Sequence, residues 1–319
     1  MRISEILDKY YQHFNAREVK DSVNAWVDLF NRGGKMFISL GGAMSTAGIG
    51  GVLSKLIEND LVCGISTTGA NLEEDYFRAV AYKDYLHFSQ PHFLSLEDEE
   101  GITNQEYSRV YDTAIPVSVM QRTYDELAPY FEKAIQAQEI YAPYEYYYQM
   151  FRDRKLTFKD SWLSAACEKD VFIVTPGYED SSLGNIVTAQ KEMGNLPHYN
   201  FMTSGLEQMS SLAQWYQKNR KEKEIGFYQI GGGISGDFPL CVVPLILNDL
   251  KISTEPWSLF TQISDSTTSY GSFSGALPKE KITWRKINKE TPAFSINSDA
   301  TIVFPLMVVA ILEKLKLLS

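Results

Sequence analysis

The chain has 319 residues, of which 44% are hydrophobic and 22% charged. This composition is ordinary for a globular protein and excludes intrinsic disorder, a collagen-like fibre and a disulfide-stapled small domain. The 40 acidic and 30 basic side chains give a net charge of -10, so nucleic acid is a poor partner. Cationic small molecules suit an acidic chain, although many proteins are acidic for solubility alone.

Strands and helices alternate in the first part of the predicted chain. Residues 1–30 are predicted to be helical, from apolar side chains at helical spacing that end before a glycine pair at 33–34. Residues 35–40 and 61–67 are predicted buried strands, each followed by a polar, glycine-bearing turn and a helix. Strand, turn, helix and strand in this order are typical of a parallel α/β sheet.

The middle of the chain is predicted to be less regular. Residues 85–120 are predicted to be irregular, and the acidic run 97–100 is interpreted as a solvated surface. Residues 121–168 are predicted to be helical. Their tyrosines between positions 144 and 148 favour a core or a subunit interface over a binding platform.

Further strands are predicted at 171–176, 225–230, 258–264 and 294–297, which gives a sheet of at least six strands. The expected fold class is α/β, a doubly wound and mainly parallel sheet with helices on both faces.

No linker or internal repeat divides the chain, so 1–319 is predicted to be a single domain. The apolar stretch 300–312 is too short to span a bilayer and predicts a buried helix. Separated cysteines and a start without an apolar signal-peptide core predict a cytoplasmic protein.

Two glycine-rich loops are candidates for nucleotide binding. Gly231, Gly233 and Gly236 follow a predicted strand with the spacing G-x-G-x-x-G, which lets backbone N–H groups approach a pyrophosphate. The loop at 41–46 follows the first strand and could hold another part of the same nucleotide. Tight turns that require glycine explain either loop equally well. The acidic residue of a standard Rossmann site is not obvious after the next strand.

A lysine near the C-terminus is the remaining candidate for chemistry. No histidine has a second histidine or a cysteine at metal-ligand spacing, so no metal site is predicted. Glu280, Trp284 and Lys286 follow a glycine-rich segment on a predicted short helix. A lysine forms imines when burial or a neighbouring cation frees its amine. Trp284 could face a cationic substrate and Glu280 could pair with an ammonium, although Lys286 is otherwise one surface lysine among many.

Over residues 30 to 315, the chain carries segments that resemble those of the deoxyhypusine synthase family and that occur in the same order. Within the family, the chain resembles the synthase-like branch. The matching segments are 67–75, Pro176 with 180–185, 231–233, 271–275, 284–287 and 299–306. The resemblance implies an NAD-binding fold that assembles as a homotetramer with active sites between subunits. It also implies that NAD takes a hydride from the carbon beside a secondary amine of spermidine. The aminobutyl group then passes to a lysine as an imine, an acceptor amine captures it, and NADH reduces the new imine.

Carried over position by position, the resemblance implies Lys286 as the catalytic lysine, Trp284 as a substrate-packing side chain and Glu280 as an amine anchor. The implied cofactor positions are Ser45, Thr68, Glu74, Asp180, Gly231, Gly232, Gly233 and Asp299. Asn185 and Phe273 stand where the family has aspartates that grip spermidine, and Asp237 stands where it has a histidine. These three positions are predicted to contact substrate and to change which amine is recognised, because a buried ammonium needs a partner.

The expected function is NAD-dependent transfer of an aminobutyl-type group from spermidine or putrescine through an imine on Lys286. A small amine acceptor, which gives a homospermidine-like product, is favoured by the departures at Asn185, Phe273 and Asp237. Three alternatives stay open. They are a deoxyhypusine synthase that modifies a translation-factor lysine, a non-catalytic NAD-binding homologue, and another donor such as agmatine.

Overall fold

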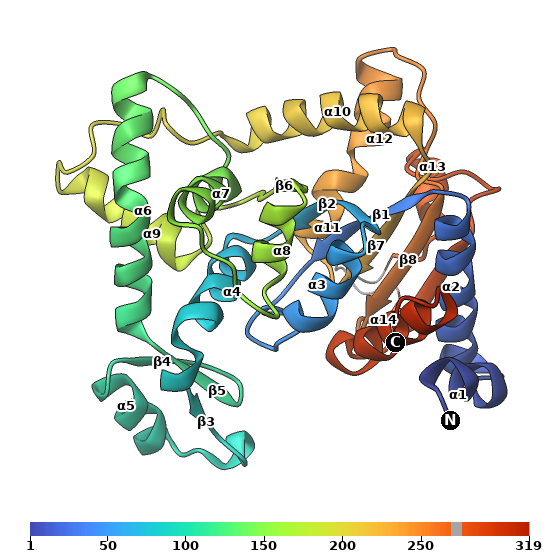
Figure 1. The fold of residues 1–319 in the computed structure, drawn as a ribbon, viewed down its shortest axis with the longest axis horizontal. Coiled ribbons are helices and arrows are strands. Elements are labelled where there is room, and N and C mark those ends of the chain that lie inside the picture. Colours follow the sequence, from blue (N-terminus) through green and yellow to red (C-terminus); the bar gives the residue numbers. More distant parts are fainter. Residues whose placement is uncertain (269–275, 319) are drawn as a thin grey trace.

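The structure is a computed structural model that describes residues 1–268 and 276–318. Its centre is a six-stranded sheet with the order β6-β2-β1-β7-β8-β9, in which all neighbours are parallel (Figure 1). The strands are β1 (Lys35–Leu40), β2 (Val62–Thr67), β6 (Phe172–Val174), β7 (Ile225–Ile230), β8 (Leu259–Ser264) and β9 (Ala293–Asn297). The six predicted strands are confirmed. The direction of winding reverses between β1 and β7.

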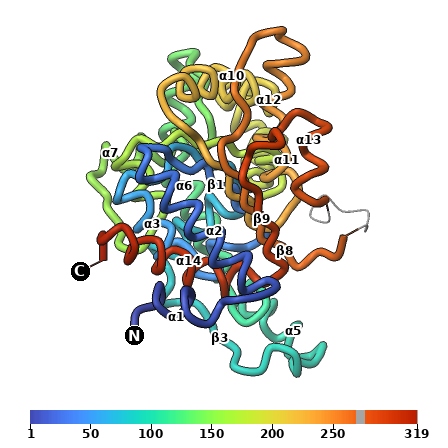
Figure 2. The backbone as a smooth tube through the Cα atoms, turned by 90° about the vertical axis from the view of Figure 1, so that its right-hand side faces the viewer, coloured from blue at the N-terminus to red at the C-terminus, as the bar shows by residue number. Residues whose placement is uncertain are grey.

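Helices cover both faces of this sheet, which confirms the doubly wound α/β prediction (Figures 1 and 2). On one face lie α1 (Ile3–Tyr10), α2 (Phe14–Asn31), α3 (Gly50–Glu58), α8 (Trp162–Glu168) and α14 (Ala300–Lys314). On the other lie α10 (Gly205–Glu222), α11 (Ile234–Leu240), α12 (Val242–Pro244) and η3 (Leu245–Asp249). The short α13 (Glu280–Thr283) follows β8 along the chain.

Alternation along the strands explains the two layers. Phe37, Phe227 and Phe260 stack side by side, with ring centroids 5.9 Å and 6.0 Å apart, in the core beneath α10. Their neighbours Ile38 and Tyr228 lie in the core on the opposite face. Successive side chains of a strand point to opposite faces. Strands that are apolar at nearly every position are therefore buried on both sides.

The two ends of the chain pack side by side (Figure 2). The Glu313 carboxylate accepts the backbone N–H of Ser4 at 2.7 Å, and Lys314 pairs with Asp8 at 2.7 Å. This contact holds α1 against α14, the predicted C-terminal helix, which is buried with Pro305 in its interior. None of the helices in the described ranges is both long and apolar enough to cross a membrane.

The prediction of irregular structure over residues 85–120 is wrong. The segment forms a three-stranded antiparallel sheet, β3-β5-β4, beside one end of the long α6 (Figure 1). Its elements are β3 (Leu86–His87), η2 (Pro91–Phe93), α5 (Leu96–Asn104), β4 (Tyr107–Val110) and β5 (Thr113–Pro116), and η1 (Tyr82–Asp84) directly precedes it. The acidic run 97–100 lies in α5. Ser95 caps the N-terminus of this helix, because its side chain accepts the backbone N–H of Asp98. Strands of two to four residues show too little alternation to be predicted.

The remaining helices form the layer beyond β6. They are α4 (Gly69–Ala81), α6 (Val117–Ala137), α7 (Pro143–Arg154) and α9 (Ser182–Glu192). The helical prediction for residues 121–168 is confirmed, although α6 begins four residues earlier, at Val117. Tyr146, Tyr147 and Tyr148 are buried, which confirms the interpretation of this run as core.

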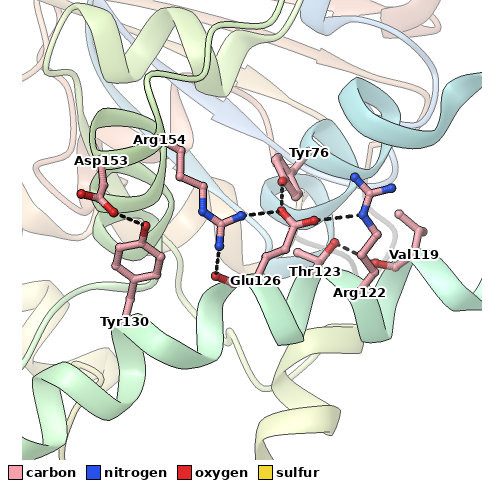
Figure 3. Close-up of polar contacts among 8 residues, drawn as sticks. All are labelled: Tyr76, Val119, Arg122, Thr123, Glu126, Tyr130, Asp153 and Arg154. Atoms are coloured by element: carbon pink, nitrogen blue, oxygen red, sulfur yellow. Dashed lines mark hydrogen bonds and ion pairs between the residues drawn. The ribbon is translucent and has the colours of Figure 1, made fainter.

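A charged cluster around Glu126 joins three of these helices (Figure 3). Its carboxylate accepts hydrogen bonds from the Tyr76 hydroxyl on α4 and from Arg122 Nε at 2.9 Å. Arg154 of α7 donates to a carboxylate oxygen of Glu126 at 3.3 Å and to its main-chain carbonyl at 3.1 Å. The cluster therefore holds α4, which starts at the carboxyl end of β2, against α6 and α7.

Candidate functional site

Two glycine loops meet at the carboxyl edge of the sheet, between β1 and β7. Gly41 donates its N–H to the carbonyl of Ile230 at 3.0 Å. A Cβ on Gly41 would lie 2.9 Å from that oxygen and 3.0 Å from the carbonyl oxygen of Gly232, so only glycine fits. Gly231 and Gly233 have φ values of +70° and +76°, which glycine adopts without strain. Ligands of open α/β sheets bind where the winding reverses, and both predicted loops lie there.

Several buried hydroxyl groups near this edge have no internal partner. Within residues 1–268 and 276–318, the hydroxyls of Ser39, Ser66, Thr67, Thr175 and Ser235 are buried and make no hydrogen bond. These residues lie near the carboxyl ends of β1, β2 and β6 and at the start of α11. An unpaired buried hydroxyl is costly. The edge therefore suits a polar ligand that supplies the missing partners.

The first turns of α4 contribute two predicted cofactor residues to the same edge. Thr68 caps the helix, because its Oγ1 accepts the backbone N–H of Asn71 at 3.1 Å. Glu74 accepts a hydrogen bond from the Thr46 hydroxyl, in the loop after β1, at 2.7 Å. Burial raises the pKa of Glu74. The loop after β1 and the start of α4 are thus tied together beside the glycine loops.

Three other predicted cofactor residues differ in their surroundings. Ser45 is buried, and its hydroxyl accepts the indole N–H of Trp162 at 3.0 Å. Asp299 caps α14, with its Oδ1 accepting the backbone N–H of Thr301 at 2.7 Å. Asp180 is exposed in the turn before α9. Ser45 and Asp299 therefore have a structural part in the fold, whereas Asp180 is accessible.

Lys286 is a buried lysine that forms an ion pair with Asp237. The Lys286 Nζ lies 2.5 Å from Asp237 Oδ1, and the lysine is 8% exposed. Asp237 belongs to α11, directly after the glycine loop of β7, and Lys286 follows α13, after β8. Trp284 is 67% exposed, and its ring centroid lies 6.0 Å from the Lys286 Nζ. The structure therefore brings together Lys286, Asp237 and Trp284, three of the predicted site residues.

Within the described ranges, neither Glu280 nor Asn185 forms a hydrogen bond or an ion pair with this group. Glu280 is exposed, and its Oε1 accepts the backbone N–H of Leu277 at 3.0 Å. Asn185 is exposed on α9, which follows β6, and β2 and β1 separate β6 from β7. Phe273 lies outside the described residues.

The sequence did not indicate a second buried lysine near Lys286. Lys281 is 7% exposed, and its Nζ lies 3.4 Å from Gln262 Oε1 and 4.9 Å from the Phe260 ring centroid. Burial, followed by the charge of Lys286, lowers the pKa of Lys281 to about 8. The available sequence signal was Gln262, a large polar side chain inside a predicted strand, since such a side chain needs a partner when it is buried.

Cys241 is another residue of this cluster that the sequence did not indicate. Its Sγ lies 3.7 Å from Asp237 Oδ2, and burial raises the pKa of the thiol.

Throughout the described ranges, no group of three His, Cys, Asp or Glu side chains could hold a metal ion. A cavity of about 610 Å³ lies beside α9, and its lining contains neither Lys286 nor Asp237.

Comparison with known proteins defines the class. The family sequence model described as "Deoxyhypusine synthase" matches residues 5–311. The chain is 26% identical to "Probable deoxyhypusine synthase 2" of Methanosarcina acetivorans over 316 residues, 98% of this chain and 87% of the relative. It is 27% identical to "Deoxyhypusine synthase-like protein" of Nostoc sp. over 326 residues, 98% of this chain and 82% of the relative. A solved structure assigned as a deoxyhypusine synthase of Entamoeba histolytica has the same fold, with TM-score 0.58, 14% identity and coverage of 97% of this chain and 92% of the other.

The chain therefore belongs to the deoxyhypusine synthase family, a family of NAD-dependent transferases that move aminobutyl groups. The predicted resemblance and fold are confirmed. Similar proteins carry both synthase and synthase-like names, so family membership alone leaves the acceptor of the transferred group undefined.

Proposed function

We propose that this protein transfers an aminobutyl-type group from a polyamine to an amine acceptor, with NAD as cofactor and an imine on Lys286. The observation that carries the proposal is the buried ion pair of Lys286 with Asp237 at 2.5 Å. The pair lies at the carboxyl edge of the sheet, beside the glycine loop that follows β7. Imine formation requires that the lysine ammonium lose a proton, and Asp237 is a carboxylate in direct contact with Lys286 that can accept it.

NAD fits the residues of this edge. The glycine loops at Gly41 and at Gly231–Gly233 leave room for backbone N–H groups to approach phosphates, and Glu74 could accept a ribose hydroxyl. The unpaired hydroxyls supply further hydrogen-bond partners. Thr68, Asp180 and Asp299 complete the proposed cofactor set, with Ser45 fixing the loop after β1. When bound, NAD would accept the hydride that leaves the carbon beside the amine nitrogen of the donor and return it to the imine that the acceptor amine forms, so the product is a saturated amine and the cofactor ends oxidised as it began.

Lys286 performs the transfer in this proposal. Its ammonium must lose a proton before the amine can attack. Asp237 Oδ1 accepts a hydrogen bond from the Lys286 Nζ and is therefore the group placed to receive this proton. The Lys286 amine then replaces the amine fragment that leaves the oxidised donor, and the acceptor amine replaces Lys286 in turn. Trp284 offers its ring face to the cationic chain of the donor.

A small amine is the proposed acceptor. Asn185 and Phe273 carry no charge where the family resemblance leads us to expect aspartates, and the carboxylate of Asp237, where the family has a histidine, is paired with Lys286. The two lost aspartates reduce the number of carboxylates that bind the ammonium groups of a long polyamine. Donor and acceptor recognition therefore differ from those of an enzyme with all of these anchors.

We also propose that the site is completed by a second copy of the chain in a homotetramer. Ile234, Trp284 and Ile302 are exposed large hydrophobic residues. They follow β7, β8 and β9 along the chain, so all three lie toward the carboxyl edge of the sheet. Apolar side chains gathered near a binding site are typical of a covered surface.

The experiment that tests this function uses small amines alone. The full chain is incubated with NAD and spermidine, with and without putrescine, and the amines are identified by mass spectrometry. We expect NAD-dependent release of the donor's amine fragment and a homospermidine-like product, lost in Lys286→Arg and kept in Lys279→Arg. A product formed only when a translation-factor lysine is supplied would move the function to deoxyhypusine synthesis. No product from a chain that binds NAD would overturn the transferase proposal.

A further inference from the structure

The segment from Lys281 to Lys286 is buried at its two ends and exposed in between. Lys281 is 7% exposed and Lys286 is 8% exposed. The four residues between them are all exposed, and Trp284 reaches 67%. In a regular α-helix, side chains five residues apart point about 140° away from each other. A change in backbone direction, and not a continued helix, must therefore return Lys286 to the buried side.

The backbone of Arg285 makes this change of direction, because its φ of +58° lies in the left-handed region. Two main-chain hydrogen bonds close the end of α13 around it. The N–H of Arg285 donates to the carbonyl of Ile282 at 2.9 Å, and the N–H of Lys286 donates to the carbonyl of Lys281 at 3.0 Å. These features define a Schellman motif, in which the residues at the two ends of the cap commonly pack together. Lys281 and Lys286 hold those two positions, which accounts for their shared burial.

The turn directs Lys286 to its partner on another element. The Lys286 Nζ lies 2.5 Å from Oδ1 of Asp237, which belongs to α11, 49 residues earlier in the chain. A residue 285 in the extended or right-handed region would break the main-chain bond between Lys286 and Lys281. The side chain of Lys286 would then leave the backbone in a different direction, so its contact with Asp237 depends on the turn.

The side chain of Arg285 makes a separate contact. Its Nη1 donates to Oδ1 of Asn248, in η3, at 3.1 Å, and both residues are exposed. Exposed polar contacts contribute little to stability, because water competes for the same groups. The left-handed region, by contrast, selects strongly among residue types. Glycine adopts it without strain, asparagine adopts it more readily than most residues, and β-branched residues adopt it least.

We propose that Arg285 is a positioning residue that acts through Lys286: its left-handed backbone, and not its guanidinium, turns the lysine toward Asp237. A residue at position 285 that adopts a positive φ readily keeps the ion pair, and a β-branched residue breaks it. The inference rests on the proposed function of Lys286, to which it adds a requirement at the preceding position.

Zero-length crosslinking tests this without NAD or an amine. A water-soluble carbodiimide activates the Asp237 carboxylate, whose side chain is 36% exposed, and the Lys286 amine attacks it to form an amide and release a urea. Mass spectrometry of the digested chain measures the crosslinked fraction. We expect Arg285→Gly, Arg285→Asn and Asn248→Ala to crosslink as the unaltered chain does, and Arg285→Val about tenfold less. Thr283→Val, at an exposed helical position two residues earlier, is the control and should keep the crosslink.

Two results would overturn the inference. One is a folded Arg285→Val chain that crosslinks as well as the unaltered chain. The other is loss of the crosslink in both Arg285→Gly and Asn248→Ala, which would assign the positioning role to the guanidinium. This second comparison decides between backbone and side chain even if Arg285→Val does not fold.

The same variants separate this inference from the proposed function. Crosslinks in the expected order, in a chain that forms no amine adduct on Lys286, would support the turn and refute the transfer. An adduct on Lys286 that forms equally fast in Arg285→Val would support the transfer and overturn the role of the turn. The affinity for NAD should be equal in all variants, since none of the altered residues belongs to the glycine loops.

Discussion

The carboxylate of Glu73 is buried, at 2% exposed, between the first turns of two helices. It accepts the backbone N–H groups of Ser182 and Leu183, both at 2.8 Å. Burial outweighs these hydrogen bonds and raises the pKa of Glu73 from 4.5 to about 7. The Glu73 carboxylate thus binds a proton more tightly in the folded state than in the unfolded state. The free energy of unfolding therefore falls as the pH rises from about 4.5 to about 7, and it changes little at higher pH.

Glu73→Gln removes this titration. We expect the fall in the free energy of unfolding between about pH 5 and about pH 8 to shrink by about 2 kcal/mol, from a pKa change of this size. Urea unfolding at several pH values measures it. Glu132→Gln, at an exposed position of α6, is the control. An unchanged pH dependence in Glu73→Gln would contradict the raised pKa.

At the residue scale, the sequence predicts which residues belong to the site better than it predicts which of them form pairs. Lys286 and Trp284 could be predicted as a pair because they lie two residues apart in a family motif. The ion pair of Lys286 with Asp237 could not, because it spans 49 residues and depends on β7 and β8 being neighbours. Lys281 resembles Lys279 in sequence, and only burial distinguishes them.

At the scale of elements, the central sheet is predictable because its strands are apolar on both faces and end in glycine or polar turns. The start of α9 is harder to predict, because the Glu73 carboxylate that accepts the N–H of Leu183 lies 110 residues away. The polar, glycine-bearing sequence of residues 179–185 predicts a loop after the strand, although α9 begins at Ser182. The small antiparallel sheet has strands too short for a local pattern.

The Glu126 cluster in Figure 3 provides the test of how α4 is held. Glu126→Ala leaves Arg122, Arg154 and the Tyr76 hydroxyl without their shared acceptor. We expect a loss of about 2 kcal/mol in the free energy of unfolding by urea denaturation, since partly buried polar groups lose a partner. Glu132→Ala removes the same charge from an exposed position of α6 and should cost less than about 0.5 kcal/mol. Equal losses in both variants would show that the cluster does not brace the helices.

At the scale of the whole molecule, the account predicts a tetramer that covers the carboxyl edge of the sheet. Sedimentation velocity of the full chain should give a species of four chains. Ile302→Glu places a charge at this edge and should shift the chain to smaller species, while Met193→Glu, after α9, should not. A single-chain species in the unaltered protein, or equal effects of the two variants, would contradict the assignment.

The central claim is that Lys286 carries the transferred group. Borohydride trapping tests it most directly: the full chain is incubated with NAD and, separately, with spermidine, putrescine and agmatine, then reduced and mapped by mass spectrometry. We expect an NAD-dependent adduct on Lys286, present in Lys279→Arg and absent in Lys286→Arg. The amine that gives the adduct identifies the donor. No adduct with any of these amines, in a chain that binds NAD, would contradict the claim and leave a dinucleotide-binding protein without transferase chemistry.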